Sequence, residues 1–162
     1  MRSEQEMLST SAIAAFRLNG QMLEVAEGLA RPVGLTAAWW QVLGAVLAAP
    51  LSVAGVARQM GITRQSVQRI ADLLVERGLA EYLVNPAHRT AKLLGPTARG
   101  REAVQRINPA HAEFAKRLSD HLGHRELDRI CDALLALSDA LDALESATAL
   151  EAPRGVGTTT RD

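Results

Sequence analysis

A short segment near the middle of the chain carries side chains that could contact the edges of DNA bases. An arginine guanidinium can donate two hydrogen bonds to guanine O6 and N7, and a glutamine amide can pair with adenine N6 and N7. All of these side chains lie in the first two turns of an expected helix, the part that enters the major groove. They are Arg64, Gln65, Gln68 and Arg69. Thr63 and Ser66 could add phosphate contacts at the helix N-terminus.

The surrounding residues 52–78, SVAGVARQMGITRQSVQRIADLLVERG, predict two helices joined by a tight turn. Apolar residues recur at helical spacing on both sides of Gly61, which allows the left-handed backbone of such a turn. Thr63 is the expected N-cap of the second helix, and Gly78 is expected to end it. The alternative is an ordinary helical hairpin with a solvated polar face, but the spacing of glycine and apolar anchors favours DNA binding.

Length and composition restrict the class of protein. A chain of 162 residues suits one domain, or one domain with a dimerisation element. The single cysteine excludes an intramolecular disulfide framework and favours a reducing cytoplasm. We expect no signal peptide, because no apolar core follows the charged residues at the N-terminus. We also expect no membrane span, because Pro50 and Ser52 interrupt the longest apolar run.

The zero net charge hides an uneven distribution. Residues 1–51 carry a net charge of −1 and residues 107–162 a net charge of −4. Residues 52–106 hold nine basic and four acidic side chains, a net charge of +5. Positive charge is therefore concentrated around the expected helix pair, where it would attract phosphate groups.

The helix pair is flanked by further expected elements. Residues 4–30 predict one long helix whose apolar residues are too many for a single narrow stripe, so we expect it to need cover on more than one side. Thr36 is expected to cap a second helix over residues 37–49. Residues 80–84 and 91–94 favour two strands joined by a turn at residues 85–90, with Lys92 facing outward. Such a hairpin forms a wing, and Arg89 at its tip could enter a minor groove. A surface arginine in a loop is an equally good interpretation of Arg89 alone.

The C-terminal third predicts helices that need a partner. Thr97 is the expected cap of a helix reaching about residue 121, with a kink or restart at Pro109. A leucine-rich seam of coiled-coil type follows, and residues 149–162 have a composition typical of disorder. The seam consists of Leu127, Ile130, Leu134, Leu137, Leu141 and Leu144. Two terminal helical regions with little else to cover them predict a symmetric homodimer.

The fold class follows as mainly α with a small β-hairpin wing: a winged helix-turn-helix flanked by N- and C-terminal dimerisation helices. We expect a dimerisation helix over residues 1–34 and the DNA-binding domain over residues 35–100. Further dimerisation helices should occupy residues 101–148, and a disordered tail residues 149–162.

At this level of detail the chain resembles the MarR family of dimeric transcription factors. The resemblance covers about residues 5–148 and rests on LTAAWWQVLGAV, the central helix pair, VERGLAEYLVNPAHR and GPTARG. It implies that Arg89 is the wing arginine and that Arg64, Gln65, Ser66, Gln68 and Arg69 lie on the recognition face. It also implies a repressor that releases a palindromic double-stranded DNA operator when a small molecule or oxidant acts on it.

The wing departs from the family pattern. His88 stands where the family commonly has the aspartate that orients the arginine, and Thr90 replaces a second arginine. We expect Arg89 to be held less firmly, and wing binding to weaken or to become pH dependent. Tyr82 and Pro96 replace a frequent arginine and leucine without disturbing the expected fold.

Other candidate sites are weaker. In such dimers, effectors bind between the dimerisation helices and the DNA-binding lobe, and Trp39 and Trp40 would lie beside that crevice as walls for a small aromatic effector. Packing in the core is the favoured alternative for both tryptophans. Cys131 is expected to be a small buried filler. The histidines lack the spacing of a metal site, so we expect neither metal nor cofactor.

The functional prediction is a sequence-specific regulator of transcription. Motifs for an enzyme, such as a glycine-rich phosphate loop or a nucleophile elbow, are not found in the sequence. The expected DNA contacts come from Thr63, Arg64, Gln65, Ser66, Gln68, Arg69, His88, Arg89 and Lys92. The alternative is a winged-helix dimer that serves protein contacts without specific DNA binding.

Overall fold

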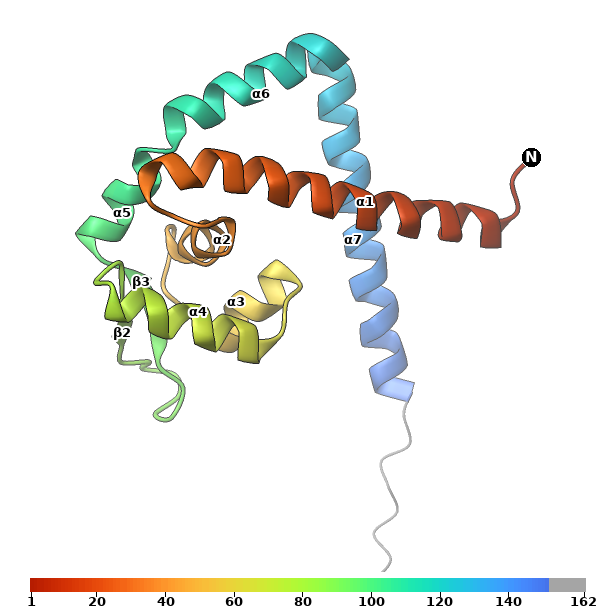
Figure 1. The fold of residues 1–162 in the computed structure, drawn as a ribbon. Coiled ribbons are helices and arrows are strands. Elements are labelled where there is room, and N and C mark those ends of the chain that lie inside the picture. Colours follow the sequence, from red (N-terminus) through yellow and green to blue (C-terminus); the bar gives the residue numbers. More distant parts are fainter. Residues whose placement is uncertain (152–162) are drawn as a thin grey trace, which may run out of the picture. The chain divides into compact units, whose positions relative to one another are not determined.

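The computed structural model describes residues 1–151, with side chains described as far as residue 147. Helices dominate, and a small antiparallel sheet accompanies them (Figure 1). The chain divides into two compact units, the first ending at Glu113 and the second beginning at Phe114, both within α6. The elements are α1 (Glu4–Ala30), η1 (Arg31–Val33), α2 (Ala37–Val46), β1 (Leu51–Ser52), α3 (Val53–Met60), α4 (Arg64–Glu76), β2 (Ala80–Leu83), β3 (Leu93–Pro96), α5 (Ala98–Gln105), α6 (Asn108–Leu122) and α7 (His124–Glu151).

The helix boundaries follow local capping chemistry. The hydroxyl groups of Thr36, Thr63 and Thr97 accept hydrogen bonds from backbone N–H groups in the first turns of α2, α4 and α5, as the sequence predicts. The predicted restart near Pro109 is confirmed, because α5 ends at Gln105 and α6 begins at Asn108. The predicted end of α2 at residue 49 is wrong, since the helix stops at Val46.

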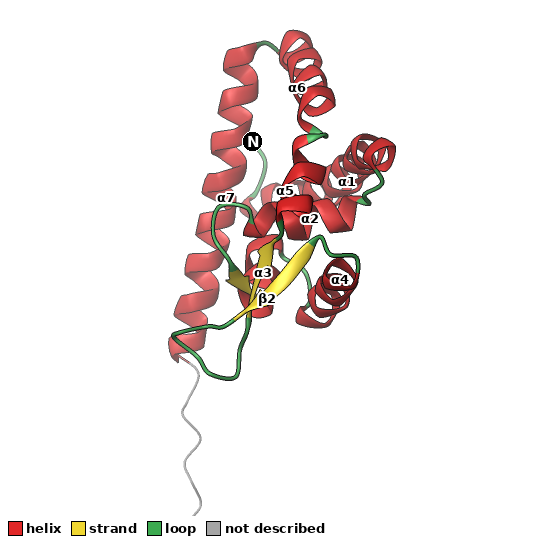
Figure 2. Ribbon diagram, turned by 90° about the vertical axis from the view of Figure 1, so that its left-hand side faces the viewer, coloured by secondary structure: helices red, strands yellow, loops and turns green. Residues whose placement is uncertain are grey.

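The sheet, whose strands are yellow in Figure 2, has the order β1-β3-β2, and both strand pairs are antiparallel. The predicted return strand over residues 91–94 is wrong by two residues, so Lys92 lies just before β3. The reason is that Leu94, fully buried, pairs with Leu51 on one side and Tyr82 on the other. The two-residue β1 was not predicted.

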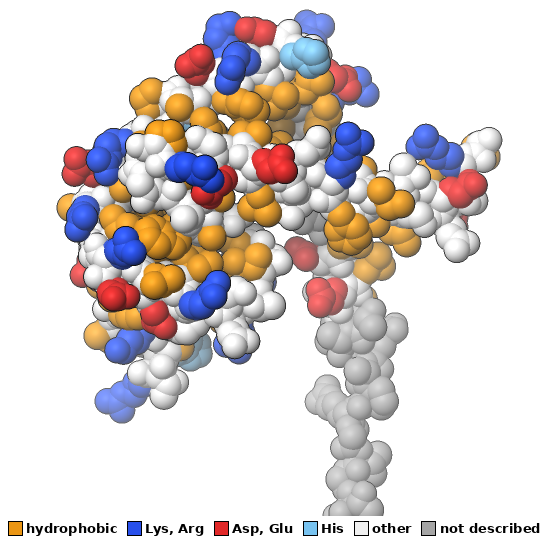
Figure 3. All heavy atoms as spheres, in the orientation of Figure 1, with side chains coloured by type: hydrophobic (Ala, Val, Ile, Leu, Met, Phe, Trp, Pro, Cys, Tyr) orange, Lys and Arg blue, Asp and Glu red, His pale blue; other side chains and the backbone are white. Residues whose placement is uncertain are grey.

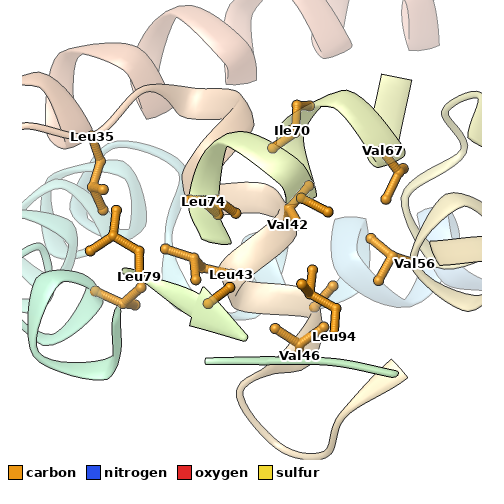
Figure 4. Packing of buried hydrophobic residues seen from close by; sticks show 14 of the residues in the cluster. Leu35, Val42, Leu43, Val46, Val56, Val67, Ile70, Leu74, Leu79 and Leu94 are labelled. Carbon is orange, nitrogen blue, oxygen red and sulfur yellow. The ribbon is translucent and has the colours of Figure 1, made fainter. Parts of the chain in front are cut away.

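The core of the first unit is aliphatic and draws on α2, α3, α4, the sheet and α5 (Figure 4). Val42, Leu43, Val56, Val67 and Leu74 are all completely buried. Because α3 and α4 bury one face each in this core, their opposite faces remain available to a partner.

Exposed apolar side chains line α1, which extends along the first unit. Figure 3 shows hydrophobic groups over the N-terminal half of this helix. Phe16 is 77% exposed and Ile13 is 69% exposed. This agrees with the prediction that α1 needs cover on more than one side.

In the second unit, the long helix α7 carries the predicted leucine seam. Leu134, Leu137 and Leu141 are exposed in the single chain, whereas Leu127 is half-buried. The expectation of a buried Cys131 is wrong for this chain, in which the thiol is exposed beside the seam. Residues 149–151 belong to α7 rather than to a disordered tail, and residues 152–162 of that predicted tail lie outside the described residues.

Candidate nucleic-acid interface

Helices α3 and α4 form the predicted helix-turn-helix. Gly61 ends α3 with φ of +63°, and Ile62 N–H then donates to Ala57 O at 3.2 Å. Thr63 Oγ1 accepts from Ser66 N–H at 3.1 Å and so fixes the start of α4. The turn therefore presents the first two turns of α4 at the surface, opposite the buried Val67 and Ile70.

A groove of about 650 Å³ lies between the exposed face of α4 and the wing. From α4 it is lined by Arg64, Gln65 and Gln68, and from the wing side by Tyr82 and Lys92. Arg64, Gln65, Gln68 and Lys92 are exposed, so their polar groups can reach a ligand in this groove. The structure thus brings together four of the residues that the sequence assigned to DNA binding.

Gln68 is held in a hydrogen-bonded triangle with two residues that the sequence did not suggest. Its Nε2 donates to Asp72 Oδ1 at 2.9 Å and to Tyr82 Oη at 2.8 Å. The Tyr82 hydroxyl donates to the same Asp72 oxygen at 2.6 Å. Burial, and then the hydrogen bond and negative charge of Asp72, raise the pKa of Tyr82 to about 12.

Two of the predicted recognition residues face a different space. Ser66 and Arg69 line a cavity of about 1020 Å³ between α1, α2 and α4, together with Glu27 and Arg31. The expectation that Arg69 shares one face with Arg64 and Gln68 is therefore only partly right. On a helix with about 100° per residue, Arg69 points about 140° from Arg64, whereas Gln68 points only about 40° from it.

The wing tip is longer than predicted, since residues 84–92 connect β2 to β3 (Figure 2). Asn85 Oδ1 accepts a hydrogen bond from Ala87 N–H at 3.0 Å, which shapes the beginning of this loop. His88 and Arg89 are both exposed at the tip. Lys92 lies closer to the sheet, with Nζ 5.8 Å from the centre of the Tyr82 ring.

The two tryptophans of α2 have different surroundings. Trp39 lies under the guanidinium of Arg77, 5.2 Å from the ring centre. Trp40 meets His111 edge to face at 5.5 Å and also lines a cavity of about 390 Å³ between α1, α2 and α3. Both rings are half-buried against the core, so packing accounts for much of each side chain.

The described residues lack two features typical of other protein classes. Within residues 1–151, no group of three or more His, Cys, Asp or Glu side chains is placed to hold a metal ion. Over the same part of the chain, no helix combines the length and apolar character that crossing a bilayer requires.

Known proteins resemble this chain in both sequence and fold. "Uncharacterized protein Rv2011c" from Mycobacterium tuberculosis is 40% identical over 128 residues, which cover 79% of this chain and 90% of that protein. A model of the MarR family matches residues 33–89, which contain the helix-turn-helix and the wing tip as far as Arg89. The chain belongs to the MarR family. This MarR-family protein is a transcriptional regulator and not an enzyme.

Solved structures of transcriptional regulators share the fold. The transcriptional repressor CouR bound to a 23-mer DNA duplex is 26% identical, with a TM-score of 0.69 over 85% of this chain and 99% of that chain. CouR from Rhodococcus jostii RHA1 bound to p-coumaroyl-CoA is 25% identical, with a TM-score of 0.64 over 78% of this chain and 90% of that chain. A MarR mutant from E. coli complexed with operator DNA is 18% identical, with a TM-score of 0.69 over 84% of this chain and 99% of that chain. At this identity the similarity supports the fold alone.

Proposed function

We propose that this MarR-family protein is a homodimeric repressor of transcription in the cytoplasm. It binds a palindromic double-stranded DNA operator and releases the operator when a small aromatic effector binds. The observation that carries the proposal is the groove between α4 and the wing, where Arg64, Gln65, Gln68 and Lys92 come together. A winged-helix module that only contacts proteins would not need these base-contacting side chain types in one groove.

Base contacts are assigned to the first two turns of α4. With 13 residues, this helix is about 20 Å long and can lie in a major groove about 12 Å wide. Arg64 would favour guanine, while Gln65 and Gln68 would contact exocyclic amino groups. These contacts would supply specificity.

Phosphate and minor-groove contacts supply most of the affinity in this proposal. Thr63 and Ser66 stand at the N-terminus of α4, although their hydroxyl groups also hydrogen bond to each other at 2.9 Å. Lys92 reaches phosphate beside the groove, and the exposed Arg89 enters the minor groove with His88 beside it. The net charge of +5 over residues 52–106 supports this arrangement.

Dimerisation is assigned to residues 1–34 and 101–148, and DNA binding to residues 35–100. The support is the row of exposed apolar side chains on α1 and the exposed leucines of α7, which water solvates poorly. A two-fold dimer would place two α4 helices in successive major grooves if they stand about 34–36 Å apart. A palindromic operator would match that symmetry.

Effector binding is assigned to the cavity between α1, α2 and α4. It has both apolar walls, such as Leu23 and Ile70, and charged groups, among them Arg31 and Arg69. That mixture suits an aromatic compound with an anionic group, and the complex of CouR with p-coumaroyl-CoA supports this class. Trp40 lines the neighbouring cavity and remains a candidate wall, whereas Trp39 is engaged by Arg77.

The proposal is tested by selecting operator DNA from a random duplex pool and comparing variants on it. We expect Arg64→Ala to lose about 1–3 kcal/mol of binding free energy on the operator and little on random DNA. Arg99→Ala is the matched control, because it removes the same charge from an exposed position of α5 outside both the groove and the segments assigned to dimerisation. Equal losses on operator and random DNA would contradict base contact by Arg64.

A protein-contact module gives a different outcome in the same experiment. Selection would return no enriched sequence, and substitution of Arg64 or Arg89 would leave the residual DNA affinity nearly unchanged. Loss of operator binding by Arg89→Ala, with folding intact, would support the wing assignment instead.

A further inference from the structure

A second cavity beside α2, which we call the Trp40 cavity, has walls from α1, α2 and α3. Its volume of about 390 Å³ lies within the range of small-molecule sites. On α1 the lining residues stand at helical positions i, i+3, i+4 and i+7, so they share one face of that helix. The lining residues are Asn19, Met22, Leu23, Ala26, Trp40, Gln41, Gly44, Ala45, Gln59 and Met60.

The Trp40 cavity differs in charge from the larger cavity to which the effector is assigned above. The larger cavity is lined by Glu24, Glu27, Arg31 and Arg69 in addition to apolar groups. Among the described residues that line the Trp40 cavity, none is charged. Moving an ion out of water without a counter-charge costs free energy, whereas the same transfer of an uncharged ring is favourable. The Trp40 cavity therefore favours uncharged molecules.

Three side-chain amides supply the polar groups of the Trp40 cavity. Asn19 comes from α1, Gln41 from α2 and Gln59 from α3. Within the side chains described up to residue 147, none of these three amides has a hydrogen-bond partner. An amide both donates and accepts, so each can bind an amide, carbonyl or hydroxyl group of a ligand. Apolar walls with a few such polar groups are the usual composition of a small-molecule site.

The indole of Trp40 gives the cavity a flat wall. His111 of α6 meets this ring edge to face, with the ring centres 5.5 Å apart, and so restricts its orientation. Met22 and Met60 line the same space, and unbranched thioether side chains adapt to the outline of an aromatic ring. A flat aromatic molecule can therefore pack on Trp40 with methionine contacts beside it.

Gly44 leaves the space beside Trp40 open. It lies one helical turn after Trp40 on α2, and no atom lies within 4 Å of a Cβ added at this position. Because the Cβ of a helical residue leans towards the helix N-terminus, a larger side chain at position 44 would extend towards Trp40. Such a side chain would occupy the cavity without a clash at its Cβ.

We propose that the Trp40 cavity is a second ligand site, which takes an uncharged aromatic molecule carrying an amide, carbonyl or hydroxyl group. The ring packs on Trp40 beside Met22 and Met60, and the polar group bonds to the side-chain amides that line the cavity. This ligand differs in charge from the anionic effector proposed for the neighbouring cavity. The inference depends neither on that effector nor on the proposed DNA binding.

Nuclear magnetic resonance of the full chain tests the proposal with two probes of nearly the same shape. Benzamide is uncharged at neutral pH, whereas benzoate has the same ring and carries one negative charge. The chain has two tryptophans, so Trp39→Phe assigns both indole N–H signals. We expect benzamide to shift the Trp40 signal with a dissociation constant about tenfold or more below that of benzoate at the same signal.

Two glycines provide matched variants for the two cavities. Gly44→Leu fills the Trp40 cavity and should weaken benzamide binding by about tenfold or more. Gly28→Leu is the control, because Gly28 lines the neighbouring cavity and also has no atom within 4 Å of an added Cβ. It should leave benzamide binding at Trp40 unchanged. Both glycines are exposed in helices, where leucine is the better helix former, so thermal melting should show both variants folded.

Ala26→Leu narrows the Trp40 cavity from α1 and should weaken benzamide binding in the same way, which keeps the test valid if Gly44→Leu fails to fold. Equal affinities of benzamide and benzoate at the Trp40 signal would overturn the selection against charge. Benzamide binding that survives in folded Gly44→Leu or Ala26→Leu would overturn the assignment to this cavity.

The absence of any shift at Trp40 with millimolar benzamide would overturn the site altogether. Operator binding is measured separately on the same protein. A failure of the second ligand site is therefore distinguishable from a failure of the proposed function.

Discussion

Replacing Gly100 by alanine should destabilise the first unit strongly, because α5 packs directly on the chain that leaves α4. A Cβ atom at this position would lie 1.9 Å from the backbone oxygen of Leu79 and 3.0 Å from its carbonyl carbon. These are backbone atoms, so rotation of a side chain cannot relieve the clash. The helix and the chain must instead separate by about 1 Å or more.

The magnitude follows from what that separation breaks. Thr97 N–H donates to Leu79 O at 3.1 Å, and Thr97 Oγ1 donates to Gly78 O at 2.7 Å. Overpacking typically costs 1–3 kcal/mol, a lost hydrogen bond about 1 kcal/mol, and alanine returns about 1 kcal/mol through its helix propensity. We expect a loss of about 3 kcal/mol in the free energy of unfolding.

Urea denaturation followed by circular dichroism measures this loss. Gly20→Ala in α1 is the control, because no atom lies within 4 Å of its added Cβ, and it should be neutral or slightly stabilising. A change of less than about 0.5 kcal/mol in Gly100→Ala, the size of an ordinary surface substitution, would refute the packing argument.

Three further predictions concern the interface, the wing and the single tyrosine. Phe16→Asp, at a side chain that is 77% exposed, should weaken dimerisation by about tenfold or more, as measured by sedimentation equilibrium. Lys92→Ala should weaken operator and random DNA alike and lower the salt slope by about 1 in fluorescence anisotropy. Tyr82, the only tyrosine, should titrate near pH 12 at 295 nm, and Asp72→Ala should lower that midpoint. Because the folded pKa lies above the usual 10, the stabilisation from this proton is complete below pH 10 and is lost as the pH rises towards 12.

Local signals in the sequence were sufficient for the starts of three helices of the first unit and for the end of α3. The threonine caps at Thr36, Thr63 and Thr97 depend only on a hydroxyl and the next turn of backbone, and all three are confirmed. Gly61 likewise ends α3 in the left-handed conformation that the turn requires. Such features need no information about the rest of the chain.

Strand register and side chain direction depend on tertiary packing, which the sequence pattern does not contain. β3 begins at Leu93 because Leu94 must enter the core between β1 and β2, and the two-residue β1 has no periodic signal of its own. Arg69 faces the cavity because α1 and α2 cover that side of α4.

Of the two contacts of Gln68, the sequence could have suggested only the one with Asp72. Asp72 is one turn away on the same helix, a spacing that favours a glutamine–aspartate hydrogen bond and could have drawn attention to it. Tyr82, by contrast, reaches Gln68 only because β2 folds back beside α4. A residue that looked like a free recognition side chain is thus partly committed.

The central claim is that this chain binds a specific DNA operator as a dimer. Fluorescence anisotropy with the selected operator and a scrambled duplex, across a salt series, tests it most directly. We predict a tight complex with two protomers per operator, and a logarithm of affinity that falls by about 0.9 per phosphate contact for each tenfold rise in salt. Equal affinity for the operator and the scrambled duplex at every salt concentration would contradict the claim.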